Sequence, residues 1–181
     1  MNKIKGYKIT LIPLSENVFD ILVNQSNIKI GEVCIKLNNN TPLLICEVNL
    51  EQYDENYYLM SICLLIKYAL SVLKNKSILL LPKNYAEFKM CKKLLGEEKE
   101  IDNKLYFEWQ NSPLLLGEYI HFKGNHYNLH FIAKHSEDLS EYCVYEPLYG
   151  DGGMWVRPAK MWGEAVEKDD VFYPRFEKIW E

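Results

Sequence analysis

The stretch YIHFKGNHYNLHF, residues 119–131, decides how we expect the second half of this chain to fold. Two runs of alternating apolar and polar residues flank Gly124 and Asn125. This is typical of a β-hairpin with a two-residue turn, because glycine supplies the positive φ that such a turn requires. Pairing Lys123 with His126 fixes the expected register. One face of the hairpin then carries Ile120, Phe122, Tyr127, Leu129 and Phe131. The other face carries Tyr119, His121, Lys123, His126, Asn128 and His130.

Two further strands are expected beyond this hairpin, at residues 142–149 and 154–157, on either side of a glycine-rich turn at 150–153. Four short strands separated by turns favour antiparallel pairing throughout. The prediction for the second half is therefore a small curled antiparallel sheet or barrel.

The first half of the chain alternates strand-like and helix-like segments and ends where Asn111, Ser112 and Pro113 break the pattern. We expect strands at residues 8–14, 28–37, 43–50, 77–81 and 104–109. Helices are expected at residues 18–23, 59–73 and 84–95. The second helix is apolar nearly all round, so it should be buried, with Asp54 or Asn56 as its N-cap. The break divides the chain into domains at residues 1–112 and 113–181.

This order of strands and helices resembles the GNAT acetyltransferase fold over residues 7–110. Two local sequences add to the resemblance: IGEV at residues 30–33, which opens a strand, and residues 84–96, a helix that ends in a leucine-glycine step. The predicted fold class is thus α+β, with a GNAT-like α/β domain followed by a barrel-like antiparallel domain. The resemblance implies acetyl-coenzyme A, whose pyrophosphate that family holds on the amides of a glycine-rich loop at a helix N-terminus.

The loop at the matching place, residues 51–58, reads EQYDENYY. It has no glycine to let the backbone approach a phosphate, and Asp54 and Glu55 would repel the anion. The family's general-acid tyrosine is missing as well, because Met90 or Cys91 stands at its spacing. We therefore predict a scaffold without catalytic chemistry and without a cofactor. The alternative is a GNAT-type N-acetyltransferase with an atypical acyl-coenzyme A loop.

The second half carries motifs that closely resemble the bacterial family catalogued as domain of unknown function 1653, over residues 118–179. The motifs are YIHFKG at 119–124, HSE at 135–137, VY at 144–145, LYGDGGMWVRP at 148–158 and PRF at 174–176. This resemblance implies a compact β fold, and it implies no established reaction.

Arg157 and Arg175 are the two arginines of a chain that otherwise uses lysine as its cation. Arginine in such a chain indicates places where the planar guanidinium fork matters. The partner of each is either an internal carboxylate, such as Glu137 or Glu146, or an external anion.

The turn at 150–153 is either a nest of backbone amides that holds an anion or an ordinary flexible turn. Beside it, Tyr145, Tyr149 and Trp155 form either a recognition surface next to Arg157 or the core of a small domain. The candidate ligand-binding residues are Tyr119, His121, Lys123, Tyr145, Tyr149, Asp151, Gly152, Gly153, Trp155, Arg157 and Arg175.

Metal binding is not expected. His121, His126 and His130 share a face in the predicted register, but no carboxylate is obviously placed beside them. The five cysteines contain no Cys-x-x-Cys pair and lie mostly in apolar runs, so we expect reduced core residues.

Charge is distributed unevenly along the chain. Residues 1–112 hold 14 lysines and 13 acids, whereas residues 113–181 hold seven lysines and arginines and 12 acids. Nucleic acid is therefore not an expected partner of the second half. No apolar run has the length of a membrane span or a signal peptide, which favours a cytoplasmic protein without membrane contact. Our first hypothesis is a binding or adaptor protein whose β module recognises a small anionic ligand or a peptide.

Overall fold

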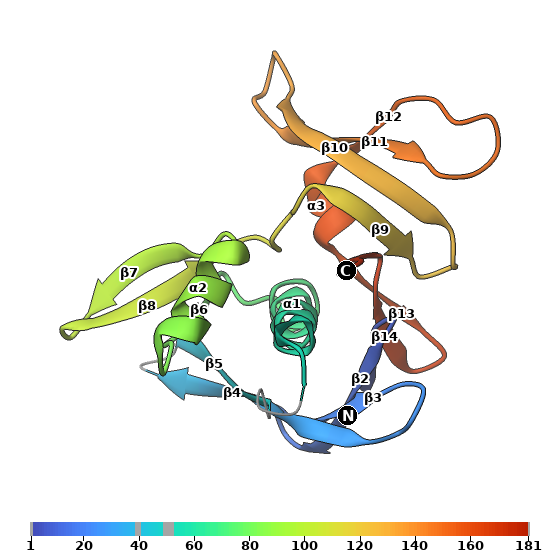
Figure 1. Ribbon diagram of the computed structural model, residues 1–181. Coiled ribbons are helices and arrows are strands. Elements are labelled where there is room, and N and C mark those ends of the chain that lie inside the picture. Colours follow the sequence, from blue (N-terminus) through green and yellow to red (C-terminus); the bar gives the residue numbers. More distant parts are fainter. Residues whose placement is uncertain (1, 39–40, 49–52, 181) are drawn as a thin grey trace.

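The computed structural model describes residues 2–38, 41–48 and 53–180. It is mostly β, with 48% of residues in strands and 18% in helices, arranged in two open sheets (Figure 1). The expected α+β class with a closed barrel is therefore wrong. In the described residues, the small sheet ends in the short strands β12 (Trp155–Pro158) and β15 (Phe176–Lys178), which do not pair with each other.

The larger sheet has ten strands in the order β13-β14-β1-β2-β3-β4-β5-β6-β8-β7. Its strands are β1 (Lys3–Lys5), β2 (Ile9–Ser15), β3 (Val18–Val23), β4 (Lys29–Asn38), β5 (Thr41–Val48), β6 (Ile78–Leu80), β7 (Glu97–Ile101), β8 (Lys104–Trp109), β13 (Ala165–Lys168) and β14 (Val171–Pro174). Strand β14 runs parallel to β1, with Lys3 opposite Val171. Two strands from beyond Ser112 thus extend the sheet of the first half, and the domain division at that residue stays a prediction.

The segment expected to be a helix at residues 18–23 is strand β3. Its buried positions, Phe19 and Ile21, follow the two-residue period of a strand. Asn17 adopts a positive φ of 60°, which makes the turn from β2 tight enough for the two strands to pair. Six residues are too few for a stable helix, so sheet pairing decides the structure here.

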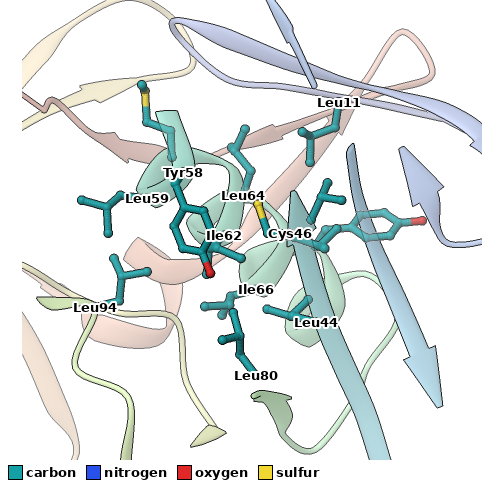
Figure 2. Close-up of a cluster of buried hydrophobic side chains, with 14 of the residues drawn as sticks. Leu11, Leu44, Cys46, Tyr58, Leu59, Ile62, Leu64, Ile66, Leu80 and Leu94 are labelled. Carbon is teal, nitrogen blue, oxygen red and sulfur yellow. The ribbon is translucent and has the colours of Figure 1, made fainter. Parts of the chain in front are cut away.

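The N-cap of the buried helix α1 (Glu55–Ser71) is Asp54, one of the two residues predicted for this place. Its carboxylate accepts a hydrogen bond from the Asn56 amide. Figure 2 shows the side chains of α1 pointing to several sides, with Leu59 toward Leu94 and Ile66 toward Leu80. The second helix, α2 (Tyr85–Lys93), follows β6 and was also predicted. The predicted hairpin of residues 28–37 and 43–50 is confirmed by β4 and β5 as far as Val48, and residues 49–50 lie outside the described ones.

The smaller sheet has five strands in the order β12-β11-β10-β9-β15. Besides the two edge strands it contains β9 (Gly117–His121), β10 (His126–Lys134) and β11 (Glu141–Pro147), and the short helix α3 (Ala159–Gly163) packs against it.

The predicted register of the first hairpin is wrong. Ile120 lies opposite His126, and Tyr119 lies opposite Tyr127, because residues 122–125 all belong to the turn. The observed register differs from the predicted one by an odd number of residues. The side chains of the first strand therefore lie on the opposite face, relative to those of the second strand, from the one predicted. Tyr119, expected on the polar face, is consequently buried with Leu129.

Candidate functional site

The centre of the smaller sheet is a stack of two aromatic rings. Trp162 from α3 and Phe176 from β15 lie parallel, with ring centroids 4.0 Å apart and an interplanar angle of 5°. Tyr119 and Tyr145 pack against the same indole at centroid distances of 5.2 and 4.9 Å. Both tyrosines were predicted to bind a ligand. Both are buried, so they pack beneath the site as part of the core of the sheet.

Arg157 lies against this stack. The carbon at the centre of its guanidinium is 5.6 Å from the centroid of the Phe176 ring, a distance typical of a cation–π contact. Its backbone lies opposite Cys143 in the sheet, so its side chain points to the buried aromatic side. The Nε atom is buried and has no hydrogen-bond partner, and no carboxylate of the described residues forms an ion pair with this arginine.

Arg175 differs from Arg157 in its partner. One of its terminal nitrogens, Nη2, is 3.3 Å from Oε2 of Glu164. Neither of the two carboxylates considered from the sequence is the partner, and Glu146 instead lies 3.1 Å from the ring of His130. The Nε atom of Arg175 is also buried without a partner.

His121 also packs against the aromatic stack. Its ring is 4.8 Å from that of Phe176. Burial, together with the positive charges of Arg157, Arg175 and Lys123, lowers the pKa of His121 to about 4. Burial is the larger cause of this low pKa, and the added effect of three cations indicates that the electrostatic potential here is positive.

A chain of aromatic rings connects the stack to the surface. Tyr127 packs edge-on against Phe176, and its hydroxyl is 2.7 Å from that of Tyr149. Burial and this hydrogen bond raise the pKa of Tyr127 to about 12. Tyr149 is 49% exposed, and Trp155, which points to the same side as Arg157, is 58% exposed.

The glycine-rich turn has the conformation its sequence requires. Gly150, Gly152 and Gly153 adopt positive φ angles of 63°, 69° and 95°. Asp151 is exposed, and the nearest contact that a side chain at Gly153 would meet is the Trp155 indole nitrogen at 3.8 Å. In the part of the chain that the structure describes, no hydrogen bond joins this turn to Arg157, so the turn borders the site.

The histidines do not converge. His126 is 2.6 Å from Glu118 and His130 pairs with Glu146, while His121 faces the aromatic stack. Within residues 2–38, 41–48 and 53–180, no group of three or more His, Cys, Asp or Glu is placed to hold a metal ion. All five cysteines are free thiols, and three of them are buried.

Sequence reasoning missed the two residues at the centre of the site. Phe176 lies inside the PRF motif, but its role depends on contact with Trp162 and Arg157, which come from other elements. A second omission is Lys67, which is buried although charged. Its signal was visible as a lysine within an apolar helical run.

The place that corresponds to the acetyltransferase cofactor loop is only partly described, since residues 49–52 lie outside the described ranges. At the start of α1, the Asp54 carboxylate accepts a hydrogen bond of 2.7 Å from the Asn56 amide. Glu55 forms an ion pair with Lys93 at 3.1 Å. A cleft opens between β5 and β6, which pair at two positions, and its lining includes Cys46, Tyr58, Lys83 and Glu87.

No helix of the described part has both the length and the apolarity to cross a bilayer.

The two halves of the chain resemble different known proteins. Residues 117–178 match the family described as protein of unknown function (DUF1653). A solved structure of a DUF1653 protein from Bordetella bronchiseptica is 32% identical over 36% of this chain and 87% of that chain, with a TM-score of 0.34. None of the curated proteins matches the chain.

Two solved structures resemble the N-terminal part. A GNAT-family acetyltransferase from Bacillus anthracis is 11% identical over 60% of this chain and 98% of its own, with a TM-score of 0.52. An acetyltransferase from Agrobacterium tumefaciens is 11% identical over 60% of this chain and 94% of its own, with a TM-score of 0.53. At this identity the likeness concerns the fold alone. Both resemblances inferred from the sequence are confirmed: the chain belongs to the DUF1653 family through its C-terminal part, and its N-terminal part shares its fold with GNAT acetyltransferases.

Proposed function

We propose that this chain is a non-catalytic binding protein whose C-terminal sheet recognises a small anionic ligand or the carboxylate of a peptide. The observation that carries the proposal is the unpaired Arg157. A buried guanidinium nitrogen without an acceptor is costly, and an anion that binds there supplies the missing acceptor.

The surroundings of Arg157 favour an anion over a cation or a neutral ligand. Burial lowers the pKa of His121 most, and the positive charges of Arg157, Arg175 and Lys123 lower it further, so all three cations act on this region. Phe176 fixes one face of the Arg157 guanidinium, so the arginine is already oriented before the ligand arrives. The exposed rings of Tyr149 and Trp155 offer apolar contact for the rest of a ligand.

The start of α1 supports the absence of acetyl transfer. In a phosphate-binding helix terminus the first amides are free to bind the anion. Here Asp54 occupies one of them, and its charge would repel a pyrophosphate. Met90 and Cys91, which stand where the family has its general acid, are buried and carry no suitable acid.

Calorimetric titration with inorganic phosphate and with acetate tests the proposal. We expect measurable binding of at least one anion by the wild type and a loss of about tenfold in affinity in Arg157→Lys, because lysine keeps the charge but loses the fork. Lys160→Met is the matched control, since Lys160 is an exposed cation on the neighbouring helix and should leave the affinity unchanged. Equal affinities in wild type and Arg157→Lys would reject the assignment.

An acetyltransferase is the second candidate, favoured by the fold and by the cleft between β5 and β6. It requires coenzyme A binding. We expect no tight binding of coenzyme A in calorimetry, and a micromolar dissociation constant, on the order of -8 kcal/mol, would establish this candidate in place of the first.

A further inference from the structure

A charged side chain connects the acetyltransferase-like part to the proposed ligand site. Lys67 lies on α1 and is 5% exposed. Its Nζ atom donates a hydrogen bond of 2.6 Å to the backbone carbonyl of Phe176. Burial lowers the pKa of Lys67 to about 8. Placing an amine in the interior is unfavourable unless it is hydrogen-bonded, so this contact is the one that compensates for its burial.

The strand that accepts this bond is held weakly by its own sheet. β15 has three residues, lies at the edge and pairs with β9 alone, with Phe176 opposite His121. The N-terminal part supplies further contacts. The Tyr7 amide donates to Oε2 of Glu177 at 2.6 Å, and a side chain at Gly6 would meet Oε1 of the same carboxylate at 2.8 Å.

Successive residues of β15 face opposite sides, as in any strand. Phe176 faces Trp162 and Arg157, whereas Glu177 faces α1 and the N-terminal segment. In Figure 1, α1 lies between the ten-stranded sheet and the smaller sheet with its helix α3. The same strand thus contributes to the anion site on one side and to the contact with the N-terminal part on the other.

From these contacts we infer that Lys67 is a positioning residue of the anion site: by fixing the Phe176 carbonyl, the acetyltransferase-like part holds the aromatic ring on which the Arg157 guanidinium rests. This inference rests on the proposed function, and it gives the scaffold a role in binding. A small cavity lies at the contact, lined by Cys63, Lys67, Tyr119 and Glu177 among others.

The test compares Lys67→Met with Leu59→Ala. Both substitutions change a buried side chain of α1, but Leu59 packs toward Leu94 (Figure 2), whereas Lys67 donates to a carbonyl of β15. Two quantities are measured: the dissociation constant for inorganic phosphate or acetate, and the NMR signal of the Trp162 indole N–H, assigned by its loss in Trp162→Phe. We expect Lys67→Met to weaken binding about fivefold or more and to shift the indole signal. Leu59→Ala should change neither. An unchanged affinity and an unchanged indole signal in Lys67→Met would overturn the inference.

The outcomes separate this inference from the proposed function. If the wild type binds neither anion, the proposed function fails, and the positioning role is decided by the indole signal alone. If Lys67→Met does not fold, Gly6→Ala replaces it, because the added methyl group pushes on the Glu177 carboxylate from the N-terminal side. A shifted Trp162 signal in Gly6→Ala supports the inference, and an unshifted signal contradicts it.

Discussion

The two hydrophobic clusters of this molecule are built differently. The larger one surrounds α1 and consists mainly of aliphatic side chains, among them Leu59, Ile62 and Leu80 (Figure 2). In the described residues, the smaller one has seven buried members, of which four are aromatic and include the stacked pair Trp162 and Phe176. An aliphatic cluster contributes packing, whereas aromatic rings also orient charged groups.

The buried cations of the two clusters differ in their hydrogen-bond partners. Arg157 and Arg175 both lie at the aromatic cluster, and each has a buried Nε atom without a partner. Lys67, the charged residue that enters the cluster around α1, has an acceptor in the Phe176 carbonyl. Oε1 of Glu177, which faces α1, also lacks a partner, so unmet hydrogen bonds are not confined to the smaller cluster. The two guanidinium nitrogens are the donors among these atoms that an anion could satisfy.

Removal of Trp162 should have the largest effect. Trp162→Ala deletes the ring that packs against Phe176, Tyr119 and Tyr145, and we expect the free energy of unfolding to fall by about 3–5 kcal/mol. Urea denaturation measures the change, and anion binding should be lost with it. A decrease below about 1 kcal/mol would show that the aromatic cluster is not a packed core.

Leu59→Ala tests the other cluster. This fully buried side chain faces Leu94, and its truncation should lower the free energy of unfolding by about 2–4 kcal/mol. Because Leu59 belongs to the cluster around α1 and not to the aromatic cluster, we expect anion affinity to be retained at temperatures where the variant is folded. Loss of affinity without further loss of stability would mean that the two clusters are coupled more broadly than through Lys67.

The two arginines should respond differently to replacement by lysine. Arg175→Lys weakens a pair with Glu164 whose side chains are 25% and 32% exposed, so we expect a loss of about 1 kcal/mol in urea denaturation. Arg157→Lys breaks no ion pair, so stability should stay within about 0.5 kcal/mol while anion affinity falls. The reverse pattern would show that Arg157 is the structural arginine.

A smaller effect is expected from pH. The pKa of His121 is lowered to about 4, so the unfolded chain takes up this proton at a higher pH than the folded one. The contribution of His121 to stability is therefore complete above the unfolded pKa of about 6.5 and is lost as pH falls through 4. NMR titration of the imidazole should show its pKa rising in Arg157→Met and unchanged in Lys160→Met. Equal pKa values in wild type and Arg157→Met would place Arg157 too far from His121 to act on it.

The sequence predicts the parts of the fold that depend on local pattern. The apolar run of α1, the β4–β5 hairpin and the DUF1653 motifs were all recognisable. Strand β3 was not, because a segment of six residues, five of them apolar, fits the period of a helix or of a strand until the neighbouring strands are known. The pairing of β1 with β14 joins opposite ends of the chain, and no local signal indicates it.

The candidate site was predictable in its residue types and not in its arrangement. Arg157 was singled out because arginine is rare in this chain, and the structure places it against Phe176. The contact could not be foreseen, because it requires β12 and β15 to lie on opposite edges of one sheet while both side chains turn to its buried face. The two-residue turn was assumed at Gly124, and its actual length moved Tyr119 and His121 to the aromatic side.

The central claim is that Arg157 binds an anion, and the chain offers a direct way to test it. Arg157 and Arg175 are its two arginines, so an NMR spectrum of arginine Nε–Hε groups contains two assignable signals. During titration with inorganic phosphate or acetate, we expect the Arg157 signal to move in a saturable way as its Nε atom acquires an acceptor, with the Arg175 signal moving less. If neither signal changes while the protein remains folded, Arg157 is not an anion-binding residue and the account is wrong.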